Sequence, residues 1–259
     1  MKLEFYKYQG TGNDFILIDN RDLSFDKNDY NTISKMCHRK FGIGADGLIL
    51  LEKSDKADFK MRYFNADGKK GSMCGNGGRC IVHFANFLKI IKDSCVFDAP
   101  DGLHKAIING NIISLQMSDV EDVELSNSNI FLNTGSPHHI TFTDNVSNLD
   151  VYNKGRKIRY GAPYFEEGTN VNFVEQLGEN TFKMRTYERG VENETLSCGT
   201  GATAVAIAVN KLNKTTDNHI NLETLGGNLE VFFNKKDKKY TNVFLKGKVE
   251  QVFKGEYLI

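Results

Sequence analysis

The stretch Ser72-Met73-Cys74-Gly75-Asn76-Gly77-Gly78-Arg79 is repeated in outline later in the chain as Leu196-Ser197-Cys198-Gly199-Thr200-Gly201-Ala202-Thr203. Each copy has one cysteine, then a glycine-rich turn, then an apolar run that is typical of a helix. A Met-Arg pair precedes each copy; the two pairs lie 123 residues apart and the two cysteines 124. This matched spacing indicates a duplicated unit that supplies one cysteine from each half.

A cysteine at the start of a helix suits proton transfer. Helix N-termini stabilise negative charge and lower the pKa of a thiol from its ordinary value of about 8.5. Glycines let backbone amides come close to a small anion, and such donors matter most where charge develops during a reaction. Two thiols on opposite faces of one carbon can remove its proton from one side and return a proton to the other. The repeat therefore predicts inversion of a stereocentre beside a carboxylate, with the cysteine pair titrating as a unit.

The composition narrows the class of protein. The chain has 259 residues, 40% of them hydrophobic and 25% charged, which is typical of a globular protein with room for two domains. The 33 basic and 33 acidic residues balance, so no nucleic-acid partner is indicated. No apolar run approaches the ~20 residues that span a bilayer, and the N-terminus lacks a signal-peptide core. We expect a cytoplasmic protein with no membrane partner.

The remaining cysteines are not predicted to do chemistry. Five cysteines are an odd number in a long chain, which argues against a disulfide framework. Cys37, Cys80 and Cys95 lie among apolar or helical residues and are expected to be small buried hydrophobes.

Other interpretations of the repeat are weaker. A single cysteine before a glycine-rich turn is usually structural, but two copies with matched landmarks argue against that. Cys74 and Cys80 are six residues apart, which fits no common zinc spacing, so no metal site is expected. Neither loop continues into the Gly-Lys-Ser/Thr of a phosphate-binding loop. A non-catalytic anion-binding module would not need cysteine in both copies.

The expected fold is α/β (α+β) with two pseudo-symmetric domains, each a curled, mostly antiparallel sheet around a central helix. The N-terminal domain would span 1–118 and the C-terminal domain 119–248, with the change at the acidic, polar segment 119–129. Expected strands are 2–8, 14–18, 48–51, 58–64, 105–108, 112–115, 172–176 and 182–187, followed by a meander over 219–259. Helices are expected over 26–39, after Cys74 with Ile81, Phe84, Phe87 and Leu88 on its apolar side, and over 202–209.

Five motifs together resemble the diaminopimelate epimerase family over nearly the whole chain. They are Gly10-Thr11-Gly12-Asn13-Asp14-Phe15, Phe64-Asn65-Ala66-Asp67-Gly68, Met73-Cys74-Gly75-Asn76-Gly77-Gly78-Arg79-Cys80, Tyr187-Glu188-Arg189-Gly190 and Ser197-Cys198-Gly199-Thr200-Gly201-Ala202. The resemblance implies an isomerase that interconverts LL- and meso-diaminopimelate for lysine and peptidoglycan synthesis without pyridoxal phosphate or any other cofactor. It also implies the epimerase-like fold, with strand 249–259 returning to the N-terminal domain, and it leaves a homodimer open.

The family also implies roles for particular residues. Cys74 and Cys198 would be the acid–base pair, and the backbone at Gly75-Asn76 and Gly199-Thr200 would hold the reacting carboxylate. The far end of the substrate, with its second ammonium and carboxylate, would be bound by Asn13, Asn65, Asn170, Glu188 and Arg189. From the sequence alone, turn formation is an equally good explanation for the three asparagines, and a solvated surface pair for Glu188-Arg189.

The sequence departs from the family at two places. Gly135-Ser136-Pro137-His138 stands where many members have Gly-Asn-Pro-His; Ser136 has a shorter reach than asparagine, and His138 is expected to support one thiol. Gly47 stands where some members carry glutamine, and a glycine cannot replace that side chain.

Two related families are the nearest alternatives. An amino-acid racemase of the proline racemase type has the same cysteine pair but usually histidine at the position of Asn76. PhzF-like isomerases lack the paired cysteines.

Overall fold

The computed structural model describes residues 2–121, 123–126 and 129–259, and the chain divides into two compact units. The first unit runs up to Leu115 and takes in Gly247–Ile259; the second is Gln116–Lys246. Each unit is a sheet with a helix packed inside it, so the expected α/β (α+β) class is confirmed. Residues 122, 127 and 128 of the acidic segment 119–129 lie outside the described residues.

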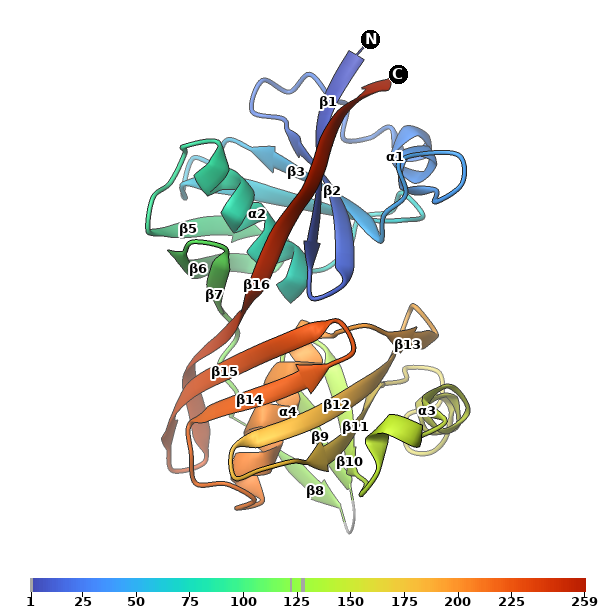
Figure 1. Ribbon diagram of the computed structural model, residues 1–259, viewed down its shortest axis with the longest axis vertical. Helices are drawn as coiled ribbons and strands as arrows, with labels where there is room; N and C mark the ends of the chain where they lie inside the picture. The colour runs from blue at the N-terminus through green and yellow to red at the C-terminus, as the bar shows by residue number, and fades with distance from the viewer. Residues whose placement is uncertain (1, 122, 127–128) are drawn as a thin grey trace. The chain divides into compact units, whose positions relative to one another are not determined.

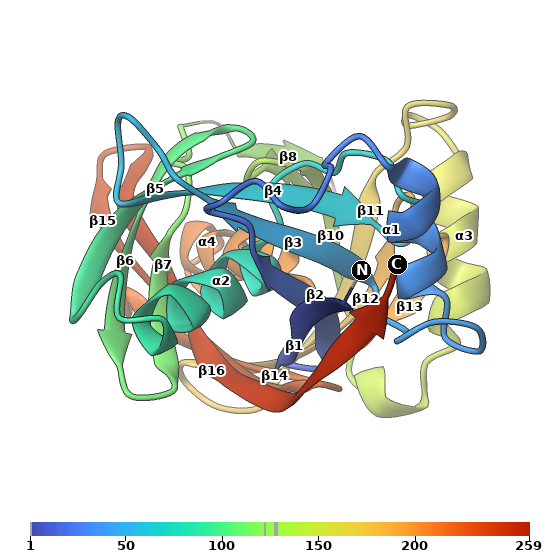
Figure 2. The same cartoon turned by 90° about the horizontal axis from the view of Figure 1, so that it is seen from above.

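The first unit is a sheet that curls around helix α2 (Gly75–Phe87) (Figures 1 and 2). Its strands, in sheet order, are β1 (Lys2–Gly10), β2 (Asn13–Asp19), β3 (Gly47–Glu52), β4 (Phe59–Asn65), β5 (Ser94–Ala99), β6 (Gly102–Asn109) and β7 (Ile112–Gln116). The last part of β16 (Lys239–Leu258) pairs antiparallel with β1, from Lys2 opposite Leu258 to Gly10 opposite Val249. Helix α1 (Tyr30–Cys37) packs outside this sheet, against β3.

The second unit repeats this plan around helix α4 (Gly199–Lys211). Its strands, in sheet order from the first part of β16, are β15 (Gly227–Lys236), β14 (His219–Thr224), β12 (Thr181–Glu188), β11 (Asn170–Gln176), β10 (Pro137–Phe142), β9 (Asn129–Asn133) and β8 (Glu124–Ser126). Strand β13 (Asn193–Thr195) pairs with β12, and the 3₁₀ turn η1 (Val146–Asn148) and helix α3 (Val151–Tyr160) pack on β11 and β12.

The two central helices explain why each sheet curls. Every residue of α4 from Gly201 to Asn210 is buried, which confirms the expectation that this apolar segment lies inside its domain. In α2, Ile81 and Phe84 are fully buried as expected. Phe87 is 48% exposed, contrary to the prediction, although its ring still packs on the edge of Tyr6. A helix that is buried over most of its surface needs strands around it, and each sheet supplies them.

Some elements differ from the sequence expectation for local reasons. Helix α1 is shorter than the expected 26–39, because the Asp29 side chain accepts a hydrogen bond from the Thr32 amide at 3.0 Å and so caps the helix there. Strand β5, strands β8 to β10 and helix α3 were not predicted. Cys37, Cys80 and Cys95 are buried free thiols, as expected. Among the described residues, no helix is both long enough and apolar enough to cross a membrane.

Candidate active site

Cys74 and Cys198 occupy equivalent positions, each as the N-cap of the central helix of its unit. Both have extended backbones, with φ −116° and ψ 119° at Cys74 and φ −129° and ψ 113° at Cys198. The Cys74 carbonyl accepts from the Gly78 amide at 2.7 Å, and the Cys198 carbonyl from the Ala202 amide at 2.8 Å. Neither cysteine side chain forms a capping hydrogen bond to its helix. The N-terminus of a helix presents N–H groups and a positive dipole end, which favour an anion.

In the first unit, Cys74 lies beside two of the predicted binding residues. Its sulfur donates to Oδ1 of Asn13 at 3.5 Å, and Nδ2 of Asn76 donates to the same oxygen at 3.3 Å. Asn13 begins β2, whereas Asn76 is in the first turn of α2 and is buried. Predicted residues that are 63 positions apart in sequence thus meet at one amide oxygen.

Arg79 is a buried cation one turn into α2, and the sequence analysis predicted no role for it beyond its place in the motif. Its guanidinium is fully buried and donates to neutral oxygens only: Gly75 O at 3.5 Å, Thr11 Oγ1 at 3.1 Å and Asn76 Oδ1 at 3.0 Å. In the described part of the chain no carboxylate forms an ion pair with it, and its Nε has no hydrogen-bond partner. A buried charge without a counter-ion is costly, so this site is well suited to receiving an anion.

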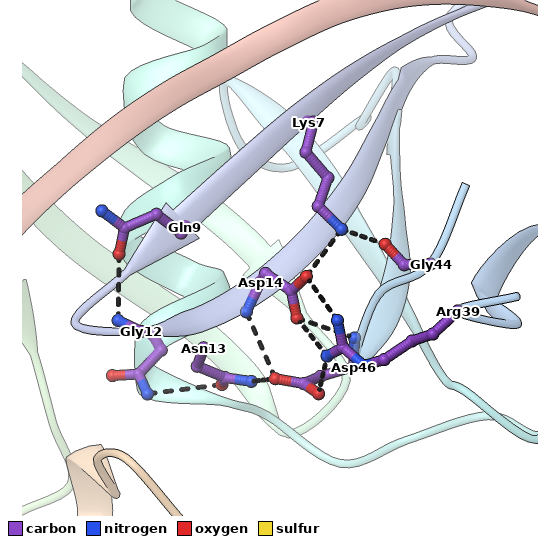
Figure 3. Close-up of polar contacts among 9 residues, drawn as sticks. Lys7, Gln9, Gly12, Asn13, Asp14, Arg39, Gly44 and Asp46 are labelled. Atoms are coloured by element: carbon purple, nitrogen blue, oxygen red, sulfur yellow. Dashed lines mark hydrogen bonds and ion pairs between the residues drawn. The ribbon is translucent and has the colours of Figure 1, made fainter. Parts of the chain in front are cut away.

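An ionic network holds Asn13 from the other side (Figure 3). Nδ2 of Asn13 donates to Oδ2 of Asp46 at 2.5 Å. Arg39 bridges Asp46 and Asp14 with 2.7 Å contacts to each, and Lys7 contacts Asp14 at 2.7 Å and donates to the Gly44 carbonyl. Burial would raise the pKa of Asp14, but the hydrogen bonds from Arg39 and Lys7 outweigh it and lower that pKa to about 2.

The departure at Gly47 has a steric reason. A Cβ on Gly47 would lie 2.5 Å from the Phe64 carbonyl oxygen and 2.5 Å from Cε2 of Tyr63. The Tyr63 ring also fills the space beside Gly71, where a Cβ would overlap it. Tyr63 therefore takes the space that a side chain at position 47 would need.

In the second unit, Cys198 lies beside a chain of buried polar side chains. Its sulfur is 3.5 Å from Oγ1 of Thr200, which is 2.9 Å from Nε2 of His138. Nδ1 of His138 is 3.1 Å from Nδ2 of Asn172. His138 is fully buried, and this burial, with the charge of Arg189, lowers its pKa to about 3.

Asn172 is held firmly at the end of this chain. Its Nδ2 also donates to the His139 carbonyl at 3.1 Å, and its Oδ1 accepts from Oγ1 of Thr186 at 3.0 Å. A Cβ on Gly201 would lie 2.6 Å from that Oδ1, so the glycine of the second motif makes room for Asn172. Asn172 and Thr186 were not among the predicted site residues, because their contacts depend on strand pairing rather than on a motif.

A second group of predicted residues meets at the ends of β10, β11 and β12. Nδ2 of Asn170 donates to Oγ of Ser136 at 2.7 Å and to the Pro137 carbonyl at 2.9 Å, while its Oδ1 accepts from the Arg189 amide at 2.9 Å. The Arg189 guanidinium donates to the Glu167 carbonyl at 2.9 Å, and Glu188 accepts from Thr195 at 3.0 Å. Ser136 thus meets the side chain of Asn170 directly.

Asn65 is apart from these groups within its unit. It ends β4, is exposed, and forms a turn in which its carbonyl accepts from the Gly68 amide at 2.9 Å. The structure thus supports the turn-forming role of Asn65 and brings together Asn13, Cys74 and Asn76. Among the residues that the structure describes, no three His, Cys, Asp or Glu side chains gather as a metal site would require.

Comparison with known proteins identifies one family. The family model for diaminopimelate epimerase matches residues 5–121 and 130–252. Diaminopimelate epimerase of Flavobacterium psychrophilum is 58% identical over 252 residues, 97% of this chain and 98% of the relative. The diaminopimelate epimerase of Chlorobaculum tepidum is 42% identical over 255 residues, which cover 95% of this chain and 98% of the relative.

Solved structures resemble this chain in fold. A PhzF-family phenazine biosynthesis protein of Bacillus anthracis has a TM-score of 0.78 at 17% identity and covers 100% of both chains. A probable proline racemase of Agrobacterium radiobacter has a TM-score of 0.71 at 13% identity, over 99% of this chain and 93% of that one. At such low identity, these similarities establish the two-unit architecture and nothing about substrate.

Asp14→Asn should destabilise the protein in a pH-dependent way. The folded pKa of about 2 lies below the unfolded value, so the ion pairs stabilise the protein above pH ~4 and lose that effect as the pH falls toward 2. We expect a loss of roughly 2 kcal/mol in the free energy of unfolding at pH 7 and a smaller loss at pH 3, measured by urea denaturation. Asp55→Asn, at an exposed site, is the control. If the difference in the free energy of unfolding between wild type and Asp14→Asn were the same at pH 7 and pH 3, the ion pairs of Asp14 with Arg39 and Lys7 would be contradicted.

Gly47→Ala should be destabilising for steric reasons alone. The nearest atom is a backbone oxygen that cannot rotate away, and overpacking of this kind costs about 1–3 kcal/mol. Gly178→Ala is the matched control, because its Cβ would be 3.8 Å from the nearest atom. Equal melting temperatures for the two variants would show that Tyr63 does not fill this space.

Proposed function

This chain belongs to the diaminopimelate epimerase family, and we propose that Cys74 and Cys198 are the acid–base pair with which it interconverts LL- and meso-diaminopimelate. The observation that carries the proposal is that both cysteines are N-caps of the central helices, with uncapped amides beside them. The activity itself follows from the family: the enzyme is an isomerase that acts on a small amino acid of lysine biosynthesis. The proline racemase alternative is not favoured, because the full-length relatives are diaminopimelate epimerases.

The reaction needs one thiolate and one thiol. The thiolate takes the α-proton and becomes a thiol, and the electron pair left on the carbon spreads onto the substrate carboxylate. The second cysteine gives its proton to the opposite face of that carbon and becomes a thiolate. Both atoms and charge balance within this pair, so the proposed chemistry uses no pyridoxal phosphate and no metal.

The amides that begin each helix support the charged intermediate. We assign the backbone at Gly75-Asn76 and Gly199-Thr200 to the reacting carboxylate, which becomes more negative as the proton leaves. Preorganised N–H donors stabilise such charge without reorganisation. Arg79 adds a buried positive charge at the α2 end, where it is fully shielded from water.

The far end of the substrate carries an ammonium and a carboxylate. We assign its carboxylate to Arg189, which is exposed, and its ammonium to Glu188 and to amide oxygens such as those of Asn13, Asn65 and Asn170. Asn170 supports this assignment because it fixes both the Arg189 backbone and Ser136. His138 and Ser136 are support residues in this proposal. The cytoplasmic location and a homodimer remain predictions from the sequence.

Isotope exchange tests the reaction and its two bases. The reduced enzyme should exchange the α-proton of LL-diaminopimelate with D₂O without added pyridoxal phosphate or metal, as measured by NMR. Cys74→Ala and Cys198→Ala should each lose at least ~10³-fold in epimerisation, because each removes a proton-transfer group.

The buried thiol variant Cys95→Ala is the matched control and should remain active when corrected for its folded fraction. If either single active-site variant kept near-full activity, the two-base mechanism would be wrong. Exchange of proline in place of diaminopimelate would instead support the racemase alternative.

A further inference from the structure

The orientation of Asn172 can be deduced from its neighbours. Its amide faces the His139 carbonyl at 3.1 Å, and a carbonyl oxygen only accepts hydrogen bonds. The amide nitrogen must therefore face this carbonyl, and the same NH₂ group faces Nδ1 of His138. Thr186 supports this orientation by donating to the Asn172 oxygen at 3.0 Å.

This orientation fixes the tautomer of His138 and the direction of the Thr200 hydroxyl. Because Nδ1 of His138 accepts from Asn172, the proton of the neutral ring is on Nε2, which donates to Oγ1 of Thr200 at 2.9 Å. In the described part of the chain, the other side-chain partner of that hydroxyl is the Cys198 sulfur at 3.5 Å. The hydroxyl of Thr200 accepts from His138 and so keeps its own proton for donation to Cys198, and a hydrogen bond in that direction stabilises a thiolate.

The chain of hydrogen bonds at Cys74 has the opposite polarity. Arg79 carries only donors, so Oδ1 of Asn76 faces it and Nδ2 of Asn76 faces Asn13. The Asp46 carboxylate carries only acceptors, so it binds Nδ2 of Asn13. The Asn13 oxygen is therefore turned toward Cys74, and this oxygen can only accept a proton from the sulfur. A thiol fits there, and a thiolate would face another electron pair.

We infer that in the resting enzyme Cys198 is the thiolate and Cys74 is the thiol. The Cys198 thiolate is supported by three positioning residues, Thr200, His138 and Asn172. The Cys74 thiol is supported by two, Asn13 and Asp46. This inference rests on the proposed function, because it assigns the two protonation states that the two-base reaction requires.

Charged groups around Cys198 agree with this assignment. Burial keeps His138 neutral at working pH, so it acts as a hydrogen-bond donor through Thr200 and not as a cation. Arg189, the cation that acts on His138, also favours a nearby anion.

The charged groups around Cys74 matter after this cysteine has donated its proton. Lys7, Asp14, Arg39 and Asp46 form a network of two cations and two anions, which adds no net charge beside Asn13. Arg79 is the remaining cation, and its interaction with Cys74 favours an anion there. That effect stabilises the thiolate that Cys74 becomes after it has donated its proton.

Alkylation of the intact, reduced enzyme by iodoacetamide tests the assignment. A thiolate reacts and a thiol does not, so the labelling rate at each cysteine, measured by peptide mass spectrometry from pH 6 to 9, follows the share of thiolate at that sulfur. Because the pair titrates as a unit, the midpoint of each labelling profile is an apparent one, and the two profiles are compared with each other. We expect the midpoint of Cys198 to lie at least one pH unit below that of Cys74, a tenfold difference in the thiolate-to-thiol ratio at a given pH. Cys37 and Cys95 are internal controls, because burial raises the pKa of each to about 12.

A variant beside Cys198 and a variant beside Cys74 should shift the labelling midpoints of the two cysteines in opposite directions. A general loss of stability would expose both cysteines and would not produce opposite shifts. Thr200→Val removes the donor and should raise the Cys198 midpoint by about one unit, whereas Thr200→Ser keeps the hydroxyl and should restore it. Asp46→Ala frees the Asn13 amide to rotate and should lower the Cys74 midpoint. Circular dichroism checks that each variant is folded.

The outcomes separate this inference from the proposed function. Earlier labelling of Cys74 in the wild type, or an unchanged Cys198 midpoint in Thr200→Val, would overturn the assignment even if diaminopimelate exchanges its α-proton. If the wild type did not exchange the α-proton of diaminopimelate but Cys198 was still labelled at lower pH than Cys74, the two-base reaction would be overturned. The assignment of the protons would then remain intact.

Discussion

A carbonyl or carboxylate oxygen can only accept hydrogen bonds, and this constraint fixes the polar side chains around both cysteines. In the first unit Asp46 determines which end of the Asn13 amide faces Cys74. In the second unit the His139 carbonyl determines the orientation of Asn172, and through it the proton position on His138. The two helix ends are alike in backbone at Cys74 and Cys198, whereas the polar side chains beside the two sulfurs differ. The proposed assignment of a thiol and a thiolate depends on that difference.

Much of the fold could be predicted because it depends on local patterns. The cysteine–glycine repeat predicted the positions of α2 and α4, and the expected strands 105–108 and 112–115 are parts of β6 and β7, which pair antiparallel. Helix α3 was missed because Gly155 and four basic residues interrupt its apolar pattern; its packing on Tyr187 needs the bare Cα of Gly155. Strand β5 was missed because it is short, and its extended conformation depends on pairing with β4 on one side and β6 on the other.

In the candidate site, too, residues within sequence motifs could be predicted and residues brought in by strand pairing could not. Cys74, Cys198, Asn13 and Asn76 stand in motifs and could be predicted with roles implied by the family. The roles of Asp46, Asn172 and Thr186 could not be predicted, because they depend on which strands pair and in which register. The buried charge of Arg79 was also invisible, since a sequence shows the residue but not the lack of a carboxylate beside it. The residues that orient the two motifs' side chains were therefore harder to predict than the motifs themselves.

Strand β16 has a consequence for how the protein is made. Residues 249–258 pair along the whole of β1, yet they follow the entire second unit in the chain. During translation the second unit can emerge complete while the first still lacks one of its strands, leaving an open sheet edge on β1. The sheet of the first unit can therefore be completed only after the whole second unit has been synthesised.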